Sequence, residues 1–228
     1  MQTGGNQMRR ALVTGAGRGI GSAAARQLRL AGYEVFAPAR AELDLADRES
    51  IEKFLHKYSD TAFDVLINNA GIHEPALVEE ISEADIQSMF EVNLYAPLRL
   101  IQGVVPNMKK NWYGRIVNTG SIWGMAGKAG RSVYAATKHG LHGITQTLAV
   151  ELAPYNILIN TVCPGFTLTD LTRKNLTEAR MKETASAIPA GRMAEPEEPA
   201  KLICFLAGED NTYITGQQIA VDGGYTSL

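Results

Sequence analysis

The chain has 228 residues, of which 45% are hydrophobic, so it can bury a full core and its length suits one large domain. Its formal net charge is -2 and its basic and acidic residues are interspersed, which excludes the basic face expected of a protein that binds nucleic acid or an anionic membrane. A small molecule is therefore the expected partner, and we expect a single domain over residues 1–228.

The N-terminus and the cysteines indicate where the protein works. Residues 1–8 have no apolar stretch behind their charge, so they predict a disordered leader rather than a targeting signal. The chain has no run of about 18 uninterrupted apolar residues, which a membrane-spanning helix would need. Two cysteines, Cys163 and Cys204, are too few for a disulfide framework or a zinc site. We expect both to be buried and reduced in a soluble, cytoplasmic protein without a bound metal.

The first predicted strand and helix flank a glycine-rich turn. Residues 10–15, "RALVTG", favour a strand, and residues 21–32, "GSAAARQLRLAG", favour a helix with Gly32 as its stop signal. Between them, "TGAGRGIG" at 14–21 could present backbone N–H groups at a helix N-terminus, where a pyrophosphate binds. The alternative, a turn that only packs closely, stays open because such motifs also occur without a ligand.

Short apolar strands alternate with longer helical patterns along the rest of the chain. Further strands are predicted over residues 33–39, 63–71, 114–121, 157–165 and 217–224, and further helices begin near Ser82, Ser132 and Pro196. Strands that are almost wholly apolar and alternate with helices predict a parallel sheet covered on both faces. The expected fold class is therefore α/β, a doubly wound, Rossmann-like parallel sheet in one domain.

A tyrosine and a lysine in the helix that begins near Ser132 suggest acid–base chemistry. Tyr134 and Lys138 are four residues apart, so their side chains emerge on one face of the helix. A tyrosine pKa of about 10 suits catalysis at neutral pH only if a cation favours the phenolate, and Lys138 could supply that charge. Ser121 follows a strand at the sheet edge where ligands bind, and its hydroxyl could hold a carbonyl oxygen. The alternative is a solvated Tyr–Lys pair, which the matching serine and glycine turn disfavour.

These motifs together resemble the short-chain dehydrogenase/reductase family. The resemblance includes "NNAG" at 68–71, "YAATK" at 134–138 and "VDGG" at 221–224, and it extends from Arg10 to Gly224. Through "IPAGRMAEPEEPA" and "YITGQQIAVDGG" it comes nearest to members similar to 3-oxoacyl-carrier-protein reductases. It implies an NADP(H)-dependent oxidoreductase that transfers a hydride between nicotinamide and a carbonyl or secondary alcohol, with a 3-oxoacyl thioester among the candidate substrates.

The resemblance also implies roles for four residues. Tyr134 would donate a proton to the carbonyl oxygen, and Lys138 would support it electrostatically and contact the cofactor ribose. Ser121 would hydrogen-bond the substrate, and Asn93 would hold a proton-relay water. For Asn93 the alternative is a residue at a helix kink that satisfies backbone groups.

A set of nicotinamide-cofactor contacts is likewise implied by the resemblance. Asp44 would meet the adenine amine, and residues 164–169 would lie over the nicotinamide. Asn68 and Ala70 would contact the adenine ribose and the central strand, although two asparagines after a strand are also ordinary turn residues. The implied cofactor-binding residues are Gly15, Arg18, Gly19, Ile20, Gly21, Arg40, Asp44, Leu45, Asn68, Ala70, Gly71, Tyr134, Lys138, Pro164, Gly165, Thr167 and Thr169.

The end of the second strand predicts which cofactor is used. Where relatives that use NAD carry an aspartate for the ribose 2′-hydroxyl, this chain has Ala39, followed by Arg40. Arg40 and Arg18 of the glycine turn would suit a 2′-phosphate, so NADPH is expected rather than NADH. The alternative is that both arginines are solvated, or that Arg40 pairs with Glu42.

The connection after the second strand is shorter than the family pattern requires. Only residues 41–43 separate Arg40 from Asp44, whereas a crossover to a parallel strand needs about a dozen residues. The usual intervening helix has no room, and we predict that its strand is lost as well. About six parallel strands then remain, with Asp44 on a short loop.

Several other residues and segments have open roles. Trp123, Met125 and His73 could line the substrate pocket or could only cover the sheet edge. Residues 166–195 favour a lid over the site. His139 and His142 lack a third metal ligand at a suitable spacing and are expected to be packing or surface residues.

The two long helices that begin near Ser82 and Ser132 carry more apolar surface than one sheet face needs. Because these helices pair across subunits in relatives, we expect a homotetramer or a homodimer. Two other functions remain as alternatives: a non-catalytic nucleotide-binding regulatory protein, and a nucleotide-sugar epimerase or dehydratase. The set of four implied catalytic residues argues against the first, and the short chain, without room for a second substrate domain, argues against the other.

Overall fold

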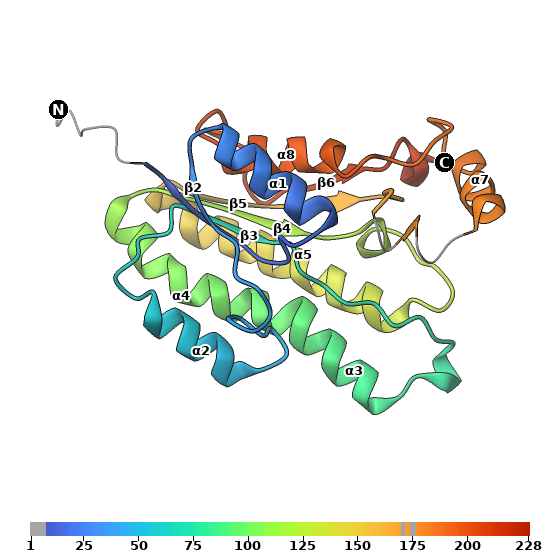
Figure 1. The fold of residues 1–228 in the computed structure, drawn as a ribbon, viewed down its shortest axis with the longest axis horizontal. Helices are drawn as coiled ribbons and strands as arrows, with labels where there is room; N and C mark the ends of the chain where they lie inside the picture. Colours follow the sequence, from blue (N-terminus) through green and yellow to red (C-terminus); the bar gives the residue numbers. More distant parts are fainter. Residues whose placement is uncertain (1–7, 170–171, 174–176) are drawn as a thin grey trace.

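The protein's structure, a computed structural model, describes residues 8–169, 172–173 and 177–228. Most of the expected leader at 1–8, and parts of the expected lid at 166–195, lie outside the described residues. In the described part, six parallel strands form one sheet in the order β2-β1-β3-β4-β5-β6 (Figure 1). The strands are β1 (Arg10–Val13), β2 (Glu34–Phe36), β3 (Val65–Asn68), β4 (Gly114–Thr119), β5 (Ile157–Pro164) and β6 (Gln218–Val221).

Helices cover both faces of this sheet. Figure 1 shows α1 and α8 on one side, with α2, α4 and α5 on the other. The α-helices of the described residues are α1 (Gly19–Leu30), α2 (Arg48–Lys57), α3 (Glu83–Phe90), α4 (Ala96–Asn111), α5 (Ser132–Leu152), α7 (Glu178–Ser186) and α8 (Glu197–Ala207). Short 3-10 turns are η1 (Val78–Glu80), η3 (Ile122–Gly124), η4 (Ala153–Tyr155) and η5 (Tyr225–Ser227), and η2 (Glu91–Tyr95) is a π-helix. The expected doubly wound fold is confirmed.

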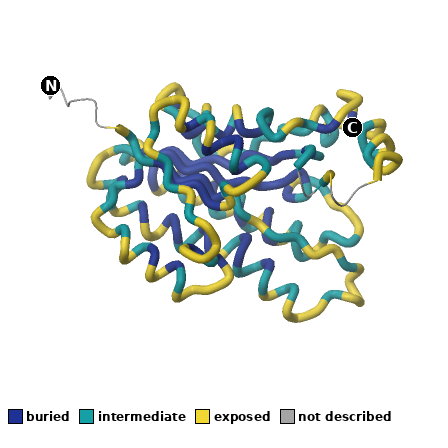
Figure 2. The backbone as a smooth tube through the Cα atoms, in the orientation of Figure 1, coloured by how far each residue is buried: buried dark blue, intermediate teal, exposed yellow. Residues whose placement is uncertain are grey.

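Alternate residues of each strand supply the two cores. Leu12 of β1 and Leu66 of β3 pack in the cluster beneath α2, α4 and α5. Their neighbours Val13 and Ile67 pack in the cluster with α1 and α8. Side chains alternate between the faces of a strand, so two helix-covered faces require apolar residues at every position. Figure 2 accordingly shows the strands as a buried layer between two partly exposed layers.

The shortened connection after β2 is confirmed. The chain makes a tight turn in which the backbone N–H groups of Glu42 and Leu43 donate to the carbonyl of Ala39. No strand occurs between β2 and β3 in this part of the chain, all of which the structure describes. Helix α2, which follows directly, was not predicted from the sequence. Its start is capped by the Asp47 carboxylate, which accepts from Glu49 N at 2.9 Å.

The helical region that begins at Ser82 is interrupted. The Ser82 side chain caps α3 as expected, but between α3 and α4 the chain widens into the π-helix η2. A π-bulge of this kind is frequent at functional sites, because the extra residue displaces side chains from the regular helical positions. Asn93 lies within it.

The two cysteines differ in burial. Cys163 is fully buried in β5, as expected. The expectation is wrong for Cys204, which is only partly buried. Cys204 lies on α8 where this helix meets α1, and its thiol donates to the carbonyl of Ala24 at 3.5 Å. Both thiols are free. None of the helices in the described part has the length and apolar character that a membrane crossing requires.

Candidate active site

The carboxyl ends of β1, β3, β4 and β5 meet at one edge of the sheet, because the strands are parallel. Thr14 follows β1, and its hydroxyl oxygen accepts hydrogen bonds from the backbone N–H groups of Asn69 (3.0 Å) and Ala70 (3.1 Å) after β3. Ser121 follows β4, and Pro164 ends β5. This is the edge at which open α/β sheets bind ligands.

The glycine-rich turn packs closely and also leaves a helix end uncapped. A Cβ on Gly15, whose φ is 66°, would lie 2.9 Å from Ala70 Cα, and a Cβ on Gly21 would lie 2.3 Å from Asn69 Nδ2. Only glycine therefore fits at these two positions. At the start of α1 the N-cap residue Arg18 makes no side-chain capping bond. Backbone N–H groups at an uncapped helix start, together with the helix dipole, suit a phosphate group.

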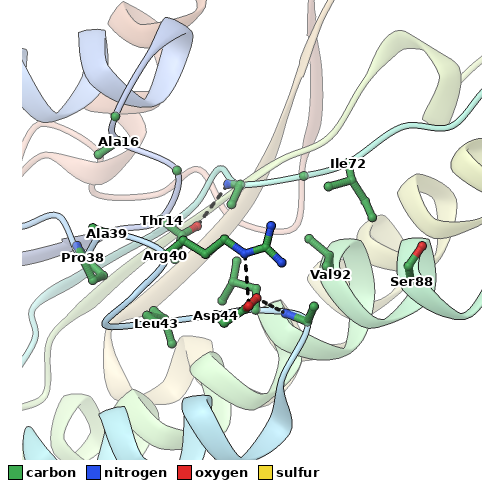
Figure 3. Close-up of a pocket in the computed structure, with 16 residues that line it drawn as sticks. Thr14, Ala16, Pro38, Ala39, Arg40, Leu43, Asp44, Ile72, Ser88 and Val92 are labelled. Atoms are coloured by element: carbon green, nitrogen blue, oxygen red, sulfur yellow. Dashed lines mark hydrogen bonds and ion pairs between the residues drawn. The ribbon is translucent and has the colours of Figure 1, made fainter. Parts of the chain in front are cut away.

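A cavity of about 540 Å³ extends from this turn to the loop after β2 (Figure 3). Its volume lies in the range of about 300–1,000 Å³ typical of cofactor and ligand pockets. Six of the implied cofactor-binding residues line it, and they are Gly15, Arg40, Asp44, Leu45, Ala70 and Gly71. Other lining residues, including Pro38, Ser88 and Val92, belong to no motif and were not predicted from the sequence. The residue types present fit a dinucleotide, because glycine backbone and a guanidinium line the same cavity.

Arg40 forms an ion pair with Asp44, and both residues line this cavity. Arg40 Nε donates to Asp44 Oδ2 at 3.1 Å, and the Arg40 side chain is 81% exposed (Figure 3). The pKa of Asp44 is lowered by a hydrogen bond from the backbone N–H of Ala46 and, to a smaller extent, by Arg40. The alternative pairing of Arg40 with Glu42 is wrong, because Glu42 accepts instead from Lys57 Nζ (2.7 Å) and the Tyr58 hydroxyl (2.9 Å).

Ser121, Tyr134 and Lys138 lie together at the same edge of the sheet. Lys138 is 3% exposed, and its Nζ donates to the carbonyl oxygen of Thr119 at 2.8 Å. That nitrogen lies 5.6 Å from the centre of the Tyr134 ring. Ser121 is 7% exposed, and it lies close enough to Tyr134 to lower the pKa of the tyrosine. The structure therefore brings together the serine, tyrosine and lysine that the sequence singles out.

Burial controls the charges of this cluster. It lowers the pKa of Lys138 to about 8. It also raises the pKa of Tyr134, against smaller lowering effects of the Ser121 side chain and of the charge of Arg131. This differs from the expectation that Lys138 would favour the phenolate, because desolvation of the ring is the larger effect. Tyr134 is consequently protonated at neutral pH and suited to donate a proton.

Asn93 ties the loop after β3 to the π-helix. Its Oδ1 accepts from Ile72 N and its Nδ2 donates to Ile72 O, both at 2.9 Å, and Nδ2 also lies 3.3 Å from Thr137 Oγ1. A Cβ on Gly71 would lie 3.2 Å from Asn93 Oδ1 and 3.5 Å from Lys138 Nζ. Asn93 therefore satisfies backbone groups, as the alternative for this residue held, and it does so beside the lysine.

The segment after β5 crosses this edge toward the glycine turn. Thr169 contacts the turn, because a Cβ on Gly19 would lie 3.1 Å from Thr169 Cγ2. Gly165 packs on Asp222, and Thr167 is 7% exposed with its hydroxyl donating to Gly165 O at 3.2 Å. The segment thus reaches from the end of β5 to the glycine turn. The implied residues Arg18, Gly19, Ile20, Gly21, Asn68, Tyr134, Lys138, Pro164, Gly165, Thr167 and Thr169 are not among those that line the 540 Å³ cavity.

Asn68 has a structural partner. Its side-chain amide is 3% exposed and donates to Asn118 Oδ1 at 2.9 Å, which joins β3 to β4. This arrangement ties up the amide nitrogen of a predicted ribose contact. A contact of Asn68 with the cofactor ribose would therefore have to use other atoms of the residue.

The residues with open roles make different contacts. His73 packs on the Tyr134 ring, with 4.5 Å between the ring centres. Trp123 packs edge-on against Phe166 and Tyr225, at 6.0 and 5.9 Å. Met125 is 41% exposed. The exposed His139 bonds only the carbonyl of Ala135 within its own helix, which agrees with a surface role.

Comparison with known proteins agrees with this geometry. A family model described as Enoyl-(Acyl carrier protein) reductase matches residues 36–226. The chain is 38% identical over 234 residues to the 3-oxoacyl-(acyl-carrier-protein) reductase FabG of Vibrio cholerae, which covers 94% of this chain and 96% of that protein. It is 41% identical to the protein of the same name from Thermotoga maritima, with 93% and 96% covered.

Solved structures agree as well. A structure described as ElxO with NADP bound superposes with a TM-score of 0.91 at 30% identity, over 97% of this chain and 100% of that one. A putative NAD(P) dependent gluconate 5-dehydrogenase from Beutenbergia cavernae, with NADP bound at low occupancy, gives a TM-score of 0.87 at 33% identity, over 96% and 97% of the two chains.

Proposed function

The chain belongs to the short-chain dehydrogenase/reductase family of NAD(P)-dependent oxidoreductases, and from this premise we propose that it reduces a ketone to a secondary alcohol with NADPH. One observation carries the proposal. The Ser121, Tyr134 and Lys138 cluster lies at the same sheet edge as a cavity that extends from a glycine cradle to Arg40. The protonated state of Tyr134 supports reduction as the favoured direction.

Each residue of the cluster has one task in this reaction. Ser121 hydrogen-bonds the ketone oxygen and orients it toward Tyr134. The Tyr134 hydroxyl gives its proton to that oxygen as the carbonyl carbon becomes tetrahedral. The Lys138 ammonium, held by Thr119 O, stabilises the phenolate that remains. The bound nicotinamide cofactor supplies the hydride that the carbon receives.

The cofactor would lie along the carboxyl edge of the sheet. The uncapped start of α1 and the turn around Gly15 would hold the pyrophosphate, with residues 164–169 over the nicotinamide. In the described structure the bond to Asp44 uses only Nε of Arg40, so the terminal nitrogens of the guanidinium are left for a 2′-phosphate. A planar guanidinium binds phosphate through two parallel hydrogen bonds, which supports NADPH over NADH.

The first substrate to test is a 3-oxoacyl thioester, because relatives of this chain carry that name. The test follows cofactor oxidation by the purified protein with an acetoacetyl thioester and a panel of other ketones, with NADPH and NADH in parallel. Ketone-dependent oxidation that favours NADPH supports the proposal. Binding of either cofactor without turnover of any ketone would contradict it.

The proposal includes the assembly and location of the enzyme. Val150 of α5 is 80% exposed and Tyr95 at the start of α4 is 45% exposed, so apolar side chains remain on the helical face beneath the sheet. We expect this face to pair in a homotetramer or a homodimer, which light scattering at micromolar concentration tests. The cytoplasm remains the proposed location.

A further inference from the structure

Two polar atoms beside Tyr134 are buried without a hydrogen-bond partner in the described structure. They are Nε2 of His73, in the loop after β3, and Nε of Arg131, at the start of α5. A buried donor or acceptor without a partner is costly, and in a native protein it often marks a site for a group that is absent. The proposed reaction uses neither side chain.

His73 is held against the catalytic tyrosine. Its ring centre lies 4.5 Å from that of Tyr134, with an angle of 53° between the planes. The preceding residue, Ile72, is fixed by both of its backbone hydrogen bonds to the Asn93 side chain. Burial lowers the pKa of His73 to about 4, so the ring is neutral at pH 7, and one of its two tautomers donates from Nε2.

Arg131 lies near Tyr134 because both residues are at the start of α5. It is the N-cap residue of α5, three positions before the tyrosine, and its carbonyl accepts from Ala135 N at 2.7 Å. A Cβ on the preceding Gly130 would lie 3.7 Å from the carbonyl oxygen of Ala76, so the loops that carry Arg131 and His73 are in contact. The charge of Arg131 lowers the pKa of both His73 and Tyr134, which reflects this proximity.

The positive charge of Arg131 lacks compensation. Among the described residues it forms no ion pair, and its side chain has a single long hydrogen bond, 3.5 Å, to the carbonyl of Gly130. The first turn of α5 contains no acidic residue. A partly buried guanidinium in such surroundings favours an anionic partner, and its donors match a carboxylate geometrically.

We propose that Arg131 and His73 bind a carboxylate of the substrate, so that the enzyme acts on oxo acids whose free carboxylate is a few carbon atoms from the ketone. This inference rests on the proposed function, since it assumes that Tyr134 protonates the ketone oxygen. The carboxylate itself is unchanged in the reaction: the ketone carbon gains the hydride and the ketone oxygen gains the proton. A neutral ester, or the 3-oxoacyl thioester named above as the first substrate to test, would leave the guanidinium charge uncompensated, so this inference favours an oxo acid over that thioester.

The test compares a free acid with its neutral ester in four measurements. The reduction of acetoacetate and of ethyl acetoacetate is measured with the wild-type enzyme and with the Arg131→Gln variant. We expect the substitution to lower kcat/KM for the acid by about 10- to 100-fold, the effect of losing a hydrogen bond to a charged group, and to change the ester by much less. The ratio of acid to ester is the diagnostic quantity, because any effect of Arg131 on the pKa of Tyr134 changes both substrates alike.

Further variants separate this role from a structural one. Arg131→Lys should restore part of the acid preference, and His73→Asn should lower the ratio of acid to ester. Arg48→Gln on α2, an exposed arginine paired with Glu52, is the matched control for loss of one positive charge and should leave the ratio unchanged. Calorimetric titration of the enzyme–NADPH complex with butyrate gives a readout independent of turnover, and binding should be lost in Arg131→Gln.

The outcomes distinguish the two proposals. An acid-to-ester ratio that is the same in wild type and Arg131→Gln, with butyrate binding unchanged, overturns the carboxylate site and leaves ketone reduction intact. If no ketone is reduced by the wild-type enzyme but butyrate binds only when Arg131 is present, the proposed reaction fails and the anion site stands. Preference for the ester in the wild-type enzyme also overturns this inference.

Discussion

The ammonium nitrogen of Lys138 lies 5.6 Å from the centre of the Tyr134 ring and is held by the carbonyl of Thr119. Lys138 is buried and Tyr134 is partly buried at the carboxyl edge of the sheet, and the loss of water shifts each toward its neutral form: the pKa of the lysine is lowered and that of the tyrosine is raised. At pH 7 the pair therefore consists of an intact phenol and a charged ammonium, which is the combination that a proton donor and its electrostatic support require.

The first prediction concerns the pH dependence of ketone reduction. The pKa of Lys138 is about 8, so its charge is present below that pH and is lost above it. Because the charge stabilises the phenolate left after proton transfer, kcat/KM for the ketone should decline above pH 8, approaching tenfold for each further pH unit. A profile measured from pH 6 to 10 checks this, and a flat profile up to pH 10 would remove Lys138 from that role.

The second prediction concerns stability. The pKa of Lys138 is about 8 in the folded protein, against 10.5 for a lysine in the unfolded chain, so between these values the unfolded chain binds more protons and stability rises with pH. Below pH 8 the buried charge costs up to about 3 kcal/mol. Compared with wild type, Lys138→Met should gain stability at pH 7, and the difference between the two should shrink toward pH 10. Denaturant unfolding at both pH values measures it; a pH-independent difference would be inconsistent with the lowered pKa.

The third prediction concerns Arg40 and cofactor choice. Loss of a charge-assisted bond to the 2′-phosphate should weaken NADPH binding by about 10- to 100-fold in Arg40→Ala. NADH, which lacks this phosphate, should bind the variant and the wild type about equally. Arg48→Ala serves as the control, because Arg48 is also exposed and also pairs with an acidic residue four positions further along the chain, Glu52. An equal loss of affinity for both cofactors, or no loss, would show that Arg40 does not bind the 2′-phosphate.

The fourth prediction compares two glycines of the same turn. Gly21→Ala places a Cβ 2.3 Å from Asn69 Nδ2 and 2.4 Å from Gly15 O, so it should destabilise the protein by about 1–3 kcal/mol. Nothing lies within 4 Å of a Cβ on Gly17, and its φ is not positive, so Gly17→Ala should change the free energy of unfolding by less than about 0.5 kcal/mol. Thermal or urea unfolding of both variants is the measurement. Similar stabilities for the two would argue against the close contact of Gly21 with Gly15 and with Asn69.

Much of the fold could be predicted because its elements have local signals. Each strand is a short apolar run, and parallel pairing then brings Thr14, Ser121 and Pro164 to one edge regardless of the details of the loops. The loss of a strand after β2 followed from chain length alone. In contrast, α2 was missed although Ile51, Phe54 and Leu55 have the spacing of an apolar helix face and Asp47 precedes them as a capping residue.

The interactions between loops could not be predicted in the same way. The sequence places Arg40 and Asp44 close together but does not indicate that they pair, since a turn sets the direction of each side chain. His73 is far from Arg131 and Tyr134 in the chain, and its approach to them depends on the contact between two loops. The π-helix around Asn93 has no sequence signal in the residues that form it.

The most direct test of the central claim is ketone-dependent oxidation of NADPH by wild type and Tyr134→Phe, with cofactor affinity measured on the same samples. The variant removes the hydroxyl and keeps the ring that packs on His73. The account predicts unchanged NADPH affinity and turnover lower by about 10²- to 10⁴-fold, the effect of losing a positioned proton donor. Turnover close to that of the wild type would contradict the account, because Tyr134 would then not be the group that protonates the ketone.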